Sequence, residues 1–344
     1  MIVARIRRML VLGVVLGAAW AMAWAAAPAE VPPPAAEAPP PAADTPAADT
    51  SPEMREWTAR MKTAELAFRT RDYAKAEAEL SAGIKVAESF GDTDQRLSAV
   101  LARLMQCYSV QGKFAQAIGP GQRLLALREK VDGPEHTTVA MVLNDLGGQY
   151  NDDGQPEKAK PLYARALAIC QKTGAKAAPL QGLVLYNMAE LERDGGNLEV
   201  AEKNARESLA VRKAAFGTGH GWYAQSLEML GTILLAKKEY VQAEEVLRQN
   251  LVIRRLKSGW NRPVIMQAMT FLADACKAQK KFEEAGNYYR QALQRGKAGL
   301  GRKDDIRATT LEAYADLLRQ TGKPDEATKL DEQAKAIREA LEKK

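Results

Sequence analysis

The groups that most often carry catalysis are scarce in this chain of 344 residues. It contains three cysteines (Cys107, Cys170 and Cys276) and two histidines (His136 and His220). Three cysteines cannot form a disulfide framework. Thiols and imidazoles spread so thinly leave few groups for metal or nucleophilic chemistry. We therefore expect no enzymatic activity, no catalytic residues, no metal site and no cofactor.

Proline is scarce over most of the chain, and the charges lack a dominant sign. Nine of the sixteen prolines fall within residues 28–52, so the remainder favours helix. The 49 lysines and arginines exceed the 43 acidic residues only slightly, and the two kinds are interleaved rather than gathered in basic runs. This pattern gives little support to a nucleic-acid surface. We expect no nucleic-acid partner.

The N-terminus has the features of a bacterial-type export signal. Arg5, Arg7 and Arg8 precede an uncharged apolar run over residues 9–27, and Ala23-Trp24-Ala25 supplies the small residues that a signal peptidase requires. We expect residues 1–25 to be removed, leaving a periplasmic or secreted protein. The alternative is an uncleaved anchor in the inner membrane, facing the periplasm, because nineteen residues at about 1.5 Å each just span a bilayer.

Residues 26–52 separate this segment from the rest of the chain. They contain ten alanines and nine prolines and have no apolar periodicity to bury. Such a composition favours extended polyproline II conformations and predicts a semi-rigid, solvated linker. The alternative is a proline-rich ligand for a partner protein.

From residue 53 onward the chain repeats with a period of 42 residues. One position of each unit is always alanine. A second position, twelve residues before this alanine, holds a small residue, with Met105 as its one large occupant. Seven units fit. The recurring alanines are Ala76, Ala117, Ala159, Ala201, Ala243, Ala285 and Ala327, and the small residues are Ala64, Gly147, Ala189, Gly231, Ala273 and Ala315.

Each unit has the spacing of two helices joined by a short turn. In the third unit, residues 141–151 and 159–169 carry apolar or small residues at intervals of three and four. Asp153-Gly154-Gln155 lies between them, and Gly112, Gly196 and Gly322 occupy the same position in other units. We expect the small and alanine positions to face each other across this hairpin, so that the helix axes approach to roughly 8 Å.

These residues resemble the tetratricopeptide repeat, and the 42-residue period resembles its kinesin-light-chain type. The resemblance implies an all-α, right-handed α-solenoid of about seven helical hairpins over residues 53–344. Two departures stand out: Ala175 replaces the corner glycine between the third and fourth units, and Gly119-Pro120-Gly121 lies inside a helix, where we expect a kink. The motif residues of the third unit are Leu143, Leu146, Gly147, Tyr150, Gly154, Pro156, Ala159, Tyr163 and Ala166, and the corner is Gly133-Pro134-Glu135-His136.

The resemblance also implies a function: in such arrays the first helices line a concave groove that holds a partner segment. We expect a non-catalytic scaffold that binds a protein or peptide partner in the bacterial cell envelope. The alternative is a self-assembling structural spacer whose ends or convex faces join copies. The peptide-binding residues would be Asn144, Asn151, Tyr186, Asn187, Glu190, Arg193, Gln225, Glu228, Gln267, Asp274, Lys277 and Arg319.

Five other residues have simpler interpretations. His136 and His220 are expected at corners between units, too far apart to share a metal ion. Cys107 and Cys276 fall on apolar faces, whereas Cys170 lies late in a second helix, where it could be more exposed and open to mixed-disulfide chemistry.

The last helix is expected to cover the end of the array. Residues 331–344 carry alternating charges, and Ala334, Ile337 and Leu341 lie on one side. This pattern predicts a solvated outer helix over the last hydrophobic face.

Overall fold

The computed structural model describes residues 51–257, 262–295 and 303–342. The export segment at residues 1–25 and all but the last two residues of the linker lie outside these ranges. No described helix has the length and apolar character needed to cross a bilayer.

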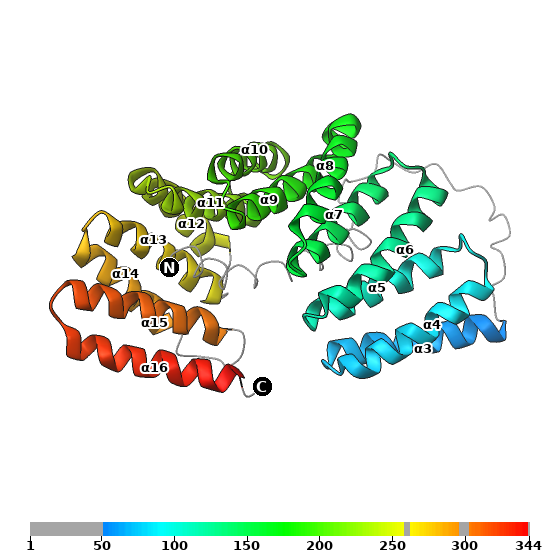
Figure 1. Ribbon diagram of the computed structural model, residues 1–344, viewed down its shortest axis with the longest axis horizontal. Helices are drawn as coiled ribbons and strands as arrows, with labels where there is room; N and C mark the ends of the chain where they lie inside the picture. Colours follow the sequence, from blue (N-terminus) through cyan, green and yellow to red (C-terminus); the bar gives the residue numbers. More distant parts are fainter. Residues whose placement is uncertain (1–50, 258–261, 296–302, 343–344) are drawn as a thin grey trace, which may run out of the picture. The chain divides into compact units, whose positions relative to one another are not determined.

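Every regular element in the described ranges is a helix, which confirms the all-α prediction (Figure 1). The α-helices form seven consecutive pairs, and a short 3-10 helix, η2 (Gly174–Ala177), precedes α9. The α-helices are α3 (Pro52–Arg69), α4 (Tyr73–Ser89), α5 (Gln95–Val110), α6 (Phe114–Asp132), α7 (Thr137–Asp152), α8 (Pro156–Thr173), α9 (Ala178–Asp194), α10 (Leu198–Phe216), α11 (Gly221–Ala236), α12 (Tyr240–Lys257), α13 (Arg262–Ala278), α14 (Phe282–Arg295), α15 (Lys303–Gln320) and α16 (Pro324–Glu342).

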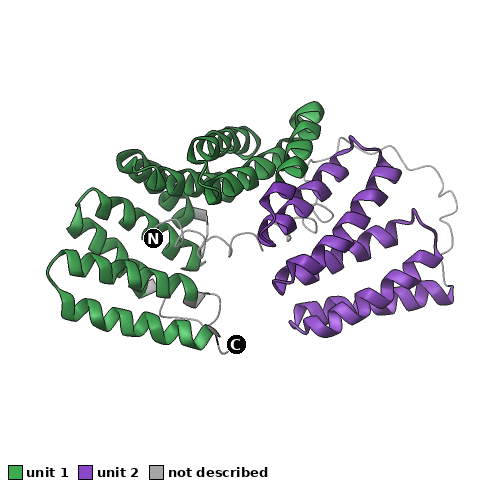
Figure 2. Ribbon diagram, viewed as in Figure 1, with its two compact units in different colours: residues 1–13, 160–344 green, residues 14–159 purple. Residues whose placement is uncertain are grey.

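The helices form two compact units (Figure 2). The described part of unit 2 is residues 51–159 and that of unit 1 is residues 160–342, so the division falls within α8. In unit 2, each helix from α3 to α7 contacts the next along the chain, and the same holds from α9 to α16 in unit 1. Each unit is therefore a stack of consecutive helical hairpins, as the repeat predicts.

The positions that the period marked as alanine or small are buried. All seven recurring alanines are fully inaccessible to solvent, and the small position is buried in each unit, including at Met105. In unit 1 the small position shows how tightly the helices meet: a Cβ added to Gly231 of α11 would lie 2.6 Å from Leu247 Cγ of α12. The expected close approach of the two helices is confirmed there.

The second unit of the repeat reverses this arrangement. Met105 of α5 is the large occupant, and Gly121 of α6 is the small one: a Cβ on Gly121 would lie 2.9 Å from Met105 Sδ. The glycine that departs from the repeat pattern thus makes room for the methionine. Helix α6 runs continuously through Pro120, and the kink there stays a prediction.

The turn within each hairpin contains one residue with left-handed backbone, at intervals of 41 or 42 residues. Gly112, Gly154, Gly196 and Gly322 have φ of 72° to 82°, as glycine at a helix end favours. The other three members of this set have φ of 61° to 65° and were not predicted from the sequence: Arg71, Lys238 and Lys280. Side chains with a Cβ destabilise this conformation, so three turns carry a conformational cost.

The corners between units also follow the repeat, with one correction. Ala175 does not replace the corner glycine, because Gly174, one residue earlier, has φ of 75° and opens η2. His136 and His220 are corner residues, as predicted. Each accepts a hydrogen bond at Nδ1 from the backbone N–H two residues later, Thr138 at 3.3 Å and Trp222 at 3.1 Å, and so caps a first helix.

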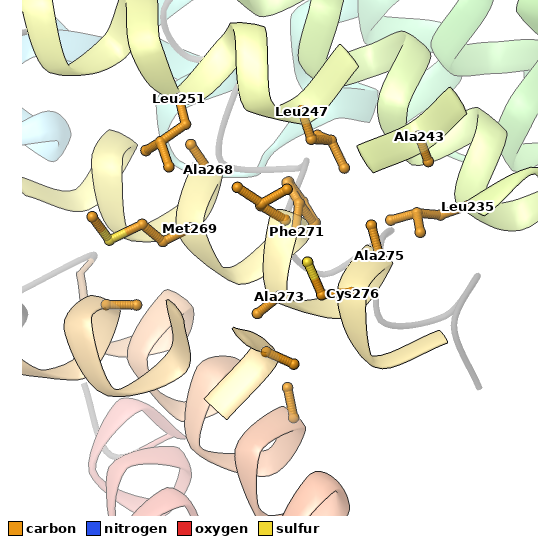
Figure 3. Close-up of a cluster of buried hydrophobic side chains, with 14 of the residues drawn as sticks. Leu235, Ala243, Leu247, Leu251, Ala268, Met269, Phe271, Ala273, Ala275 and Cys276 are labelled. Carbon is orange, nitrogen blue, oxygen red and sulfur yellow. The ribbon is translucent and has the colours of Figure 1, made fainter. Parts of the chain in front are cut away.

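The core of unit 1 is continuous from α9 to α16, and Figure 3 shows the part where α12 meets α13. Leu247 and Leu251 of α12 lie beside Ala268 and Phe271 of α13. Ala334 and Ile337 of α16 pack on α15, which supports the expected role of the last helix as a cover.

Candidate functional site

The candidate site is the surface that the first helices of the hairpins present. Residues four and seven positions apart lie on one side of a helix. We define the first-helix face as the side of each first helix that carries the residues named at the end of this paragraph. In unit 1 the helices α9, α11, α13 and α15 that carry it contact one another in sequence. The face comprises Tyr186, Glu190 and Arg193 of α9, Glu228, Thr232 and Leu235 of α11, Thr270, Asp274 and Lys277 of α13, and Glu312, Asp316 and Arg319 of α15.

The residues proposed from the sequence divide into three groups by burial. Asn144, Tyr186, Glu190, Arg193 and Glu228 are buried. Asn151, Asn187, Gln225, Gln267, Asp274 and Lys277 are half-buried, and Arg319 is exposed. Asn144 and Asn151 belong to unit 2 and the others to unit 1. The half-buried amides therefore border the first-helix face, and the charged residues that α9 and α11 contribute to this face are buried.

Arg193 is held within the protein. Its Nε and Nη2 donate to Asp194 Oδ1 at 2.9 and 2.7 Å, and its Nη1 lies 3.2 Å from Met229 Sδ. Nη2 is also 3.6 Å from Glu190. With 2% of its surface exposed, this guanidinium links α9 to α11.

Tyr186 lies among charged groups of both signs. Burial, followed by the nearby Glu190 and Glu228 carboxylates, raises the pKa of its hydroxyl, and Arg193 and Arg212 oppose that shift. The Arg212 guanidinium lies 5.0 Å from the centre of the Tyr186 ring, a cation–π distance. Arg212 donates to three neutral acceptors, Trp222 O, Gln225 Oε1 and Ser226 Oγ, and burial lowers its pKa to about 10.

The charged residues of α13 and α15 pair with their neighbours. Lys277 Nζ lies 2.6 Å from Asp316 Oδ2 and so connects two adjacent first helices. Asp274 accepts a hydrogen bond from Tyr289 of α14, and Arg319 pairs with Asp331 of α16. These contacts fix the polar groups that a bound segment would meet.

In unit 2, Asn144 donates to Asp145 Oδ1 at 3.2 Å on α7. Burial raises the pKa of Asp145 to about 6, although this hydrogen bond favours the ionised form. This carboxyl therefore changes its charge nearer to neutral pH than an exposed aspartate does.

Polar residues of the second helices, which were not predicted from the sequence, lie behind this face. Arg212 and Arg254 are 42 residues apart, on α10 and α12. Ser208 and Asn250 have the same spacing, and each donates to a carbonyl of the preceding first helix, Gly182 O and Ala224 O. Their period was a signal that could have identified them.

One cluster among the described residues has metal-ligand chemistry. Ligand atoms of Glu244, Cys276 and Glu284 lie within 4.8 Å of one another. Glu244 already bonds Lys281 at 2.6 Å and Arg248 at 2.7 Å, and burial raises the pKa of Cys276 to about 12. Two cations therefore neutralise the position that a metal would take.

Cys170 corrects an expectation. It is fully buried, like Cys107 and Cys276, and burial raises its pKa to about 11. The expected exposure and mixed-disulfide chemistry at Cys170 were wrong, since a buried thiol with a raised pKa is unreactive.

Known proteins share this architecture. BtubC (BKLC) of P. vanneervenii is 16% identical with a TM-score of 0.57, over 70% of this chain and 92% of its own. A Podosopora anserina protein described as a kinesin light chain with nearly identical TPR-like repeats is 22% identical with a TM-score of 0.51, over 61% of this chain and 100% of its own. A tetratricopeptide repeat protein of Parabacteroides merdae is 16% identical with a TM-score of 0.56, over 82% and 93%.

These likenesses concern the fold, and no curated protein sequence matches the chain. The tetratricopeptide repeat family model matches residues 106–172, 180–255 and 264–340. Proteins of that family generally mediate protein–protein interactions and are generally non-catalytic. The stacked hairpins and the family match together show that the chain belongs to the tetratricopeptide repeat family.

Proposed function

We propose that the chain is a non-catalytic scaffold that binds a segment of a partner protein along the first-helix face of unit 1. The observation that carries the proposal is the row of half-buried amides, Asn187, Gln225 and Gln267, on three successive first helices that contact one another. An amide side chain both donates and accepts, so it can bond the N–H and C=O groups of an extended chain.

We propose further that the protein acts in the bacterial cell envelope. Support comes from the sequence of residues 1–25, with its arginines, apolar run and small residues. The mass of the mature N-terminus tests this: removal of residues 1–25 supports export by a cleaved signal, and an intact N-terminus in the membrane fraction supports the anchored alternative. An intact chain in the cytosolic fraction would contradict both.

Photo-crosslinking in envelope extract tests the binding face. A photo-reactive residue at Gln267 should capture a partner, and the triple variant Asn187→Ala, Gln225→Ala and Gln267→Ala should recover less of it. The matched control replaces exposed residues of the second helices, Glu207, Gln249 and Gln294, with alanine. Equal recovery by the two triple variants would count against the face.

The self-assembling spacer has one observation in its favour. Val241, Val252 and Leu256 are 73%, 57% and 76% exposed on α12, spaced so that they lie near one side of the helix. The outermost helices give end-to-end assembly little support, since Leu66 is the one exposed large hydrophobic residue described on α3 and α16. Light scattering over a concentration series decides: a mass that stays monomeric on concentration removes this alternative.

A further inference from the structure

The charges of unit 1 are unevenly distributed between its corners and its hairpin turns. The stretches 160–189, 208–227 and 246–273 contain four, two and five lysines or arginines and no acidic residue. Each stretch spans a corner between hairpins, before α9, α11 or α13. The segments between them, 190–207 and 228–245, contain hairpin turns and hold six acids beside three basic residues and four beside two. The corners of these hairpins are therefore positive, whereas their turns carry both signs.

The three corners lie along one edge of unit 1. Helices α9, α11 and α13 each begin at a corner, and they contact one another in sequence. Four cations at these corners are exposed: Lys172 and Lys176 before α9, Lys213 before α11 and Arg255 before α13. Lys213 and Arg255 occupy the same position of successive repeats. We call these four residues, together with Leu256, the corner edge.

The helix dipole explains only part of this pattern. It favours a cation in the last turn of a helix, which accounts for Lys172 and Lys213. The same rule favours an acid in the first turn, yet α9, α11 and α13 have none there. In unit 2 the corners do carry acids, among them Asp92 and Asp132. In unit 1 the positive ends of three first helices therefore add to the charge of the corner edge.

Exposed apolar side chains accompany these cations. Leu256 is 76% exposed and directly follows Arg255, and Val252, one turn earlier on α12, is 57% exposed. Basic residues beside exposed leucine are typical of surfaces that lie on a bilayer, because the cations meet lipid phosphates while the apolar groups enter the boundary of the acyl chains. A second copy of the chain would present the same positive edge and be repelled, so a negatively charged surface is favoured.

We propose that the corner edge of unit 1 binds the surface of an anionic phospholipid bilayer. Its lysines and its arginine meet the headgroups, and Leu256 inserts beside them. Each cation near such a surface strengthens binding about fivefold, so four cations together supply about several hundredfold. The first-helix face extends from the middle of each first helix toward the hairpin turn, away from the corners. Bilayer binding therefore leaves that face to a partner segment, and either proposal can fail without the other.

Sedimentation with vesicles of phosphatidylcholine and phosphatidylglycerol tests the charges. The purified chain should bind at low salt and dissociate as the salt concentration rises. Lys213→Glu with Arg255→Glu should raise the lipid concentration at half binding by about several hundredfold. The matched control, Lys203→Glu with Lys280→Glu, changes the net charge equally at exposed sites near hairpin turns and should raise it by about threefold at most. Equal binding by the two variants, or no binding by the wild type, would overturn the inference.

A label at Leu256 tests the insertion. Because the three native cysteines are buried, a new surface cysteine can be labelled selectively. An environment-sensitive dye on Leu256→Cys should brighten on anionic vesicles. The same dye on Val241→Cys, which is 73% exposed near the other end of α12, should stay unchanged.

The label also separates the corner edge from other ways of reaching lipid. If residues 1–25 hold every variant on the vesicles, the two labelled positions still decide. An unchanged dye at Leu256 would overturn the inference. Binding to polyglutamate in preference to anionic vesicles would overturn it too, and would assign the corner edge to an acidic protein.

Discussion

Replacing Gly231 by alanine tests whether the small positions set the spacing of the hairpins. Two effects oppose each other. Alanine favours a helix interior over glycine by about 1 kcal/mol. The new Cβ, however, would lie 2.6 Å from both Leu247 Cγ and Leu247 Cδ2. Because Cγ lies near the backbone and not at a free end, the helices must move apart, and overpacking of this kind costs about 1–3 kcal/mol.

The clash should therefore win in the wild type, and Gly231→Ala should lower the free energy of unfolding by up to about 2 kcal/mol. Leu247→Ala by itself should cost about 2–5 kcal/mol through the cavity it leaves. In that background the Cβ meets no leucine, so the same glycine change should stabilise the protein by about 1 kcal/mol. The sign of the Gly231→Ala effect is thus expected to reverse. The pair Ala189 and Ala205, at the same positions of α9 and α10, shows that the repeat accommodates two alanines.

Urea unfolding followed by circular dichroism measures the four members of this cycle. Because a repeat array can unfold in stages, hydrogen exchange of α11 and α12 should report the local free energy beside the global one. Gly286→Ala is the matched control: its Cβ would lie 3.7 Å from Leu317 Cδ2, an ordinary contact, so it should stabilise α14 by about 1 kcal/mol. A Gly231→Ala effect of the same size and sign in both backgrounds would refute the reasoning.

Three further predictions concern the turns, a half-buried acid and the last helix. Lys238→Gly and Lys280→Gly should each raise the free energy of unfolding by about 0.5–1 kcal/mol in urea titrations, because left-handed backbone at these positions suits glycine. Asp145 has a pKa raised to about 6 by burial, so its protonated form stabilises the folded state at low pH and that contribution is lost as the pH rises from about 4 to 6. Asp145→Asn should therefore gain up to about 2–3 kcal/mol over the wild type across that range, whereas Asp92→Asn, at an exposed site, should show no such trend. Arg338→Ala removes ion pairs and a hydrogen bond to α15, and should cost about 1 kcal/mol and speed hydrogen exchange in α16, less so in high salt.

The period of 42 residues predicted the fold well because it reports on packing. A position that must be small or apolar in every hairpin restricts the residue type, and all seven alanines proved fully buried. The same argument is weaker for turns. Left-handed backbone favours glycine but tolerates other residues at a cost of about 1–2 kcal/mol, so Arg71, Lys238 and Lys280 gave no signal by type alone. Gly174 escaped notice because its corner differs by one residue from the period.

The candidate site was less predictable than the fold. Helical spacing placed Tyr186, Glu190 and Arg193 on one side of α9, and the structure agrees. Spacing on one helix could not show that Arg193 is buried between α9 and α11, because burial depends on Asp194, Glu190 and Met229. The second-helix residues Arg212 and Arg254 were not predicted, because the family resemblance places the groove on the first helices. The environment of a polar position can be stated only when the neighbouring helix is known.

The equivalents of Glu228 in other hairpins show that a carboxylate at this position can pair within its own hairpin. The same position is Ala102 in α5, Thr270 in α13 and Glu312 in α15, and Glu312 lies 3.2 Å from Arg338 of α16, which is the equivalent of Arg254. Burial raises the pKa of Glu228 even though Arg254 and Asn250 lower it, so its ionised form is disfavoured by the fold. The repeat therefore accepts other residues at this position, and the buried carboxylate of Glu228 costs stability when it is ionised, despite its partner Arg254. On that reasoning Glu228→Leu should stabilise unit 1 in urea unfolding at neutral pH, and a loss of stability would show that the pair with Arg254 outweighs the cost of burying the charge.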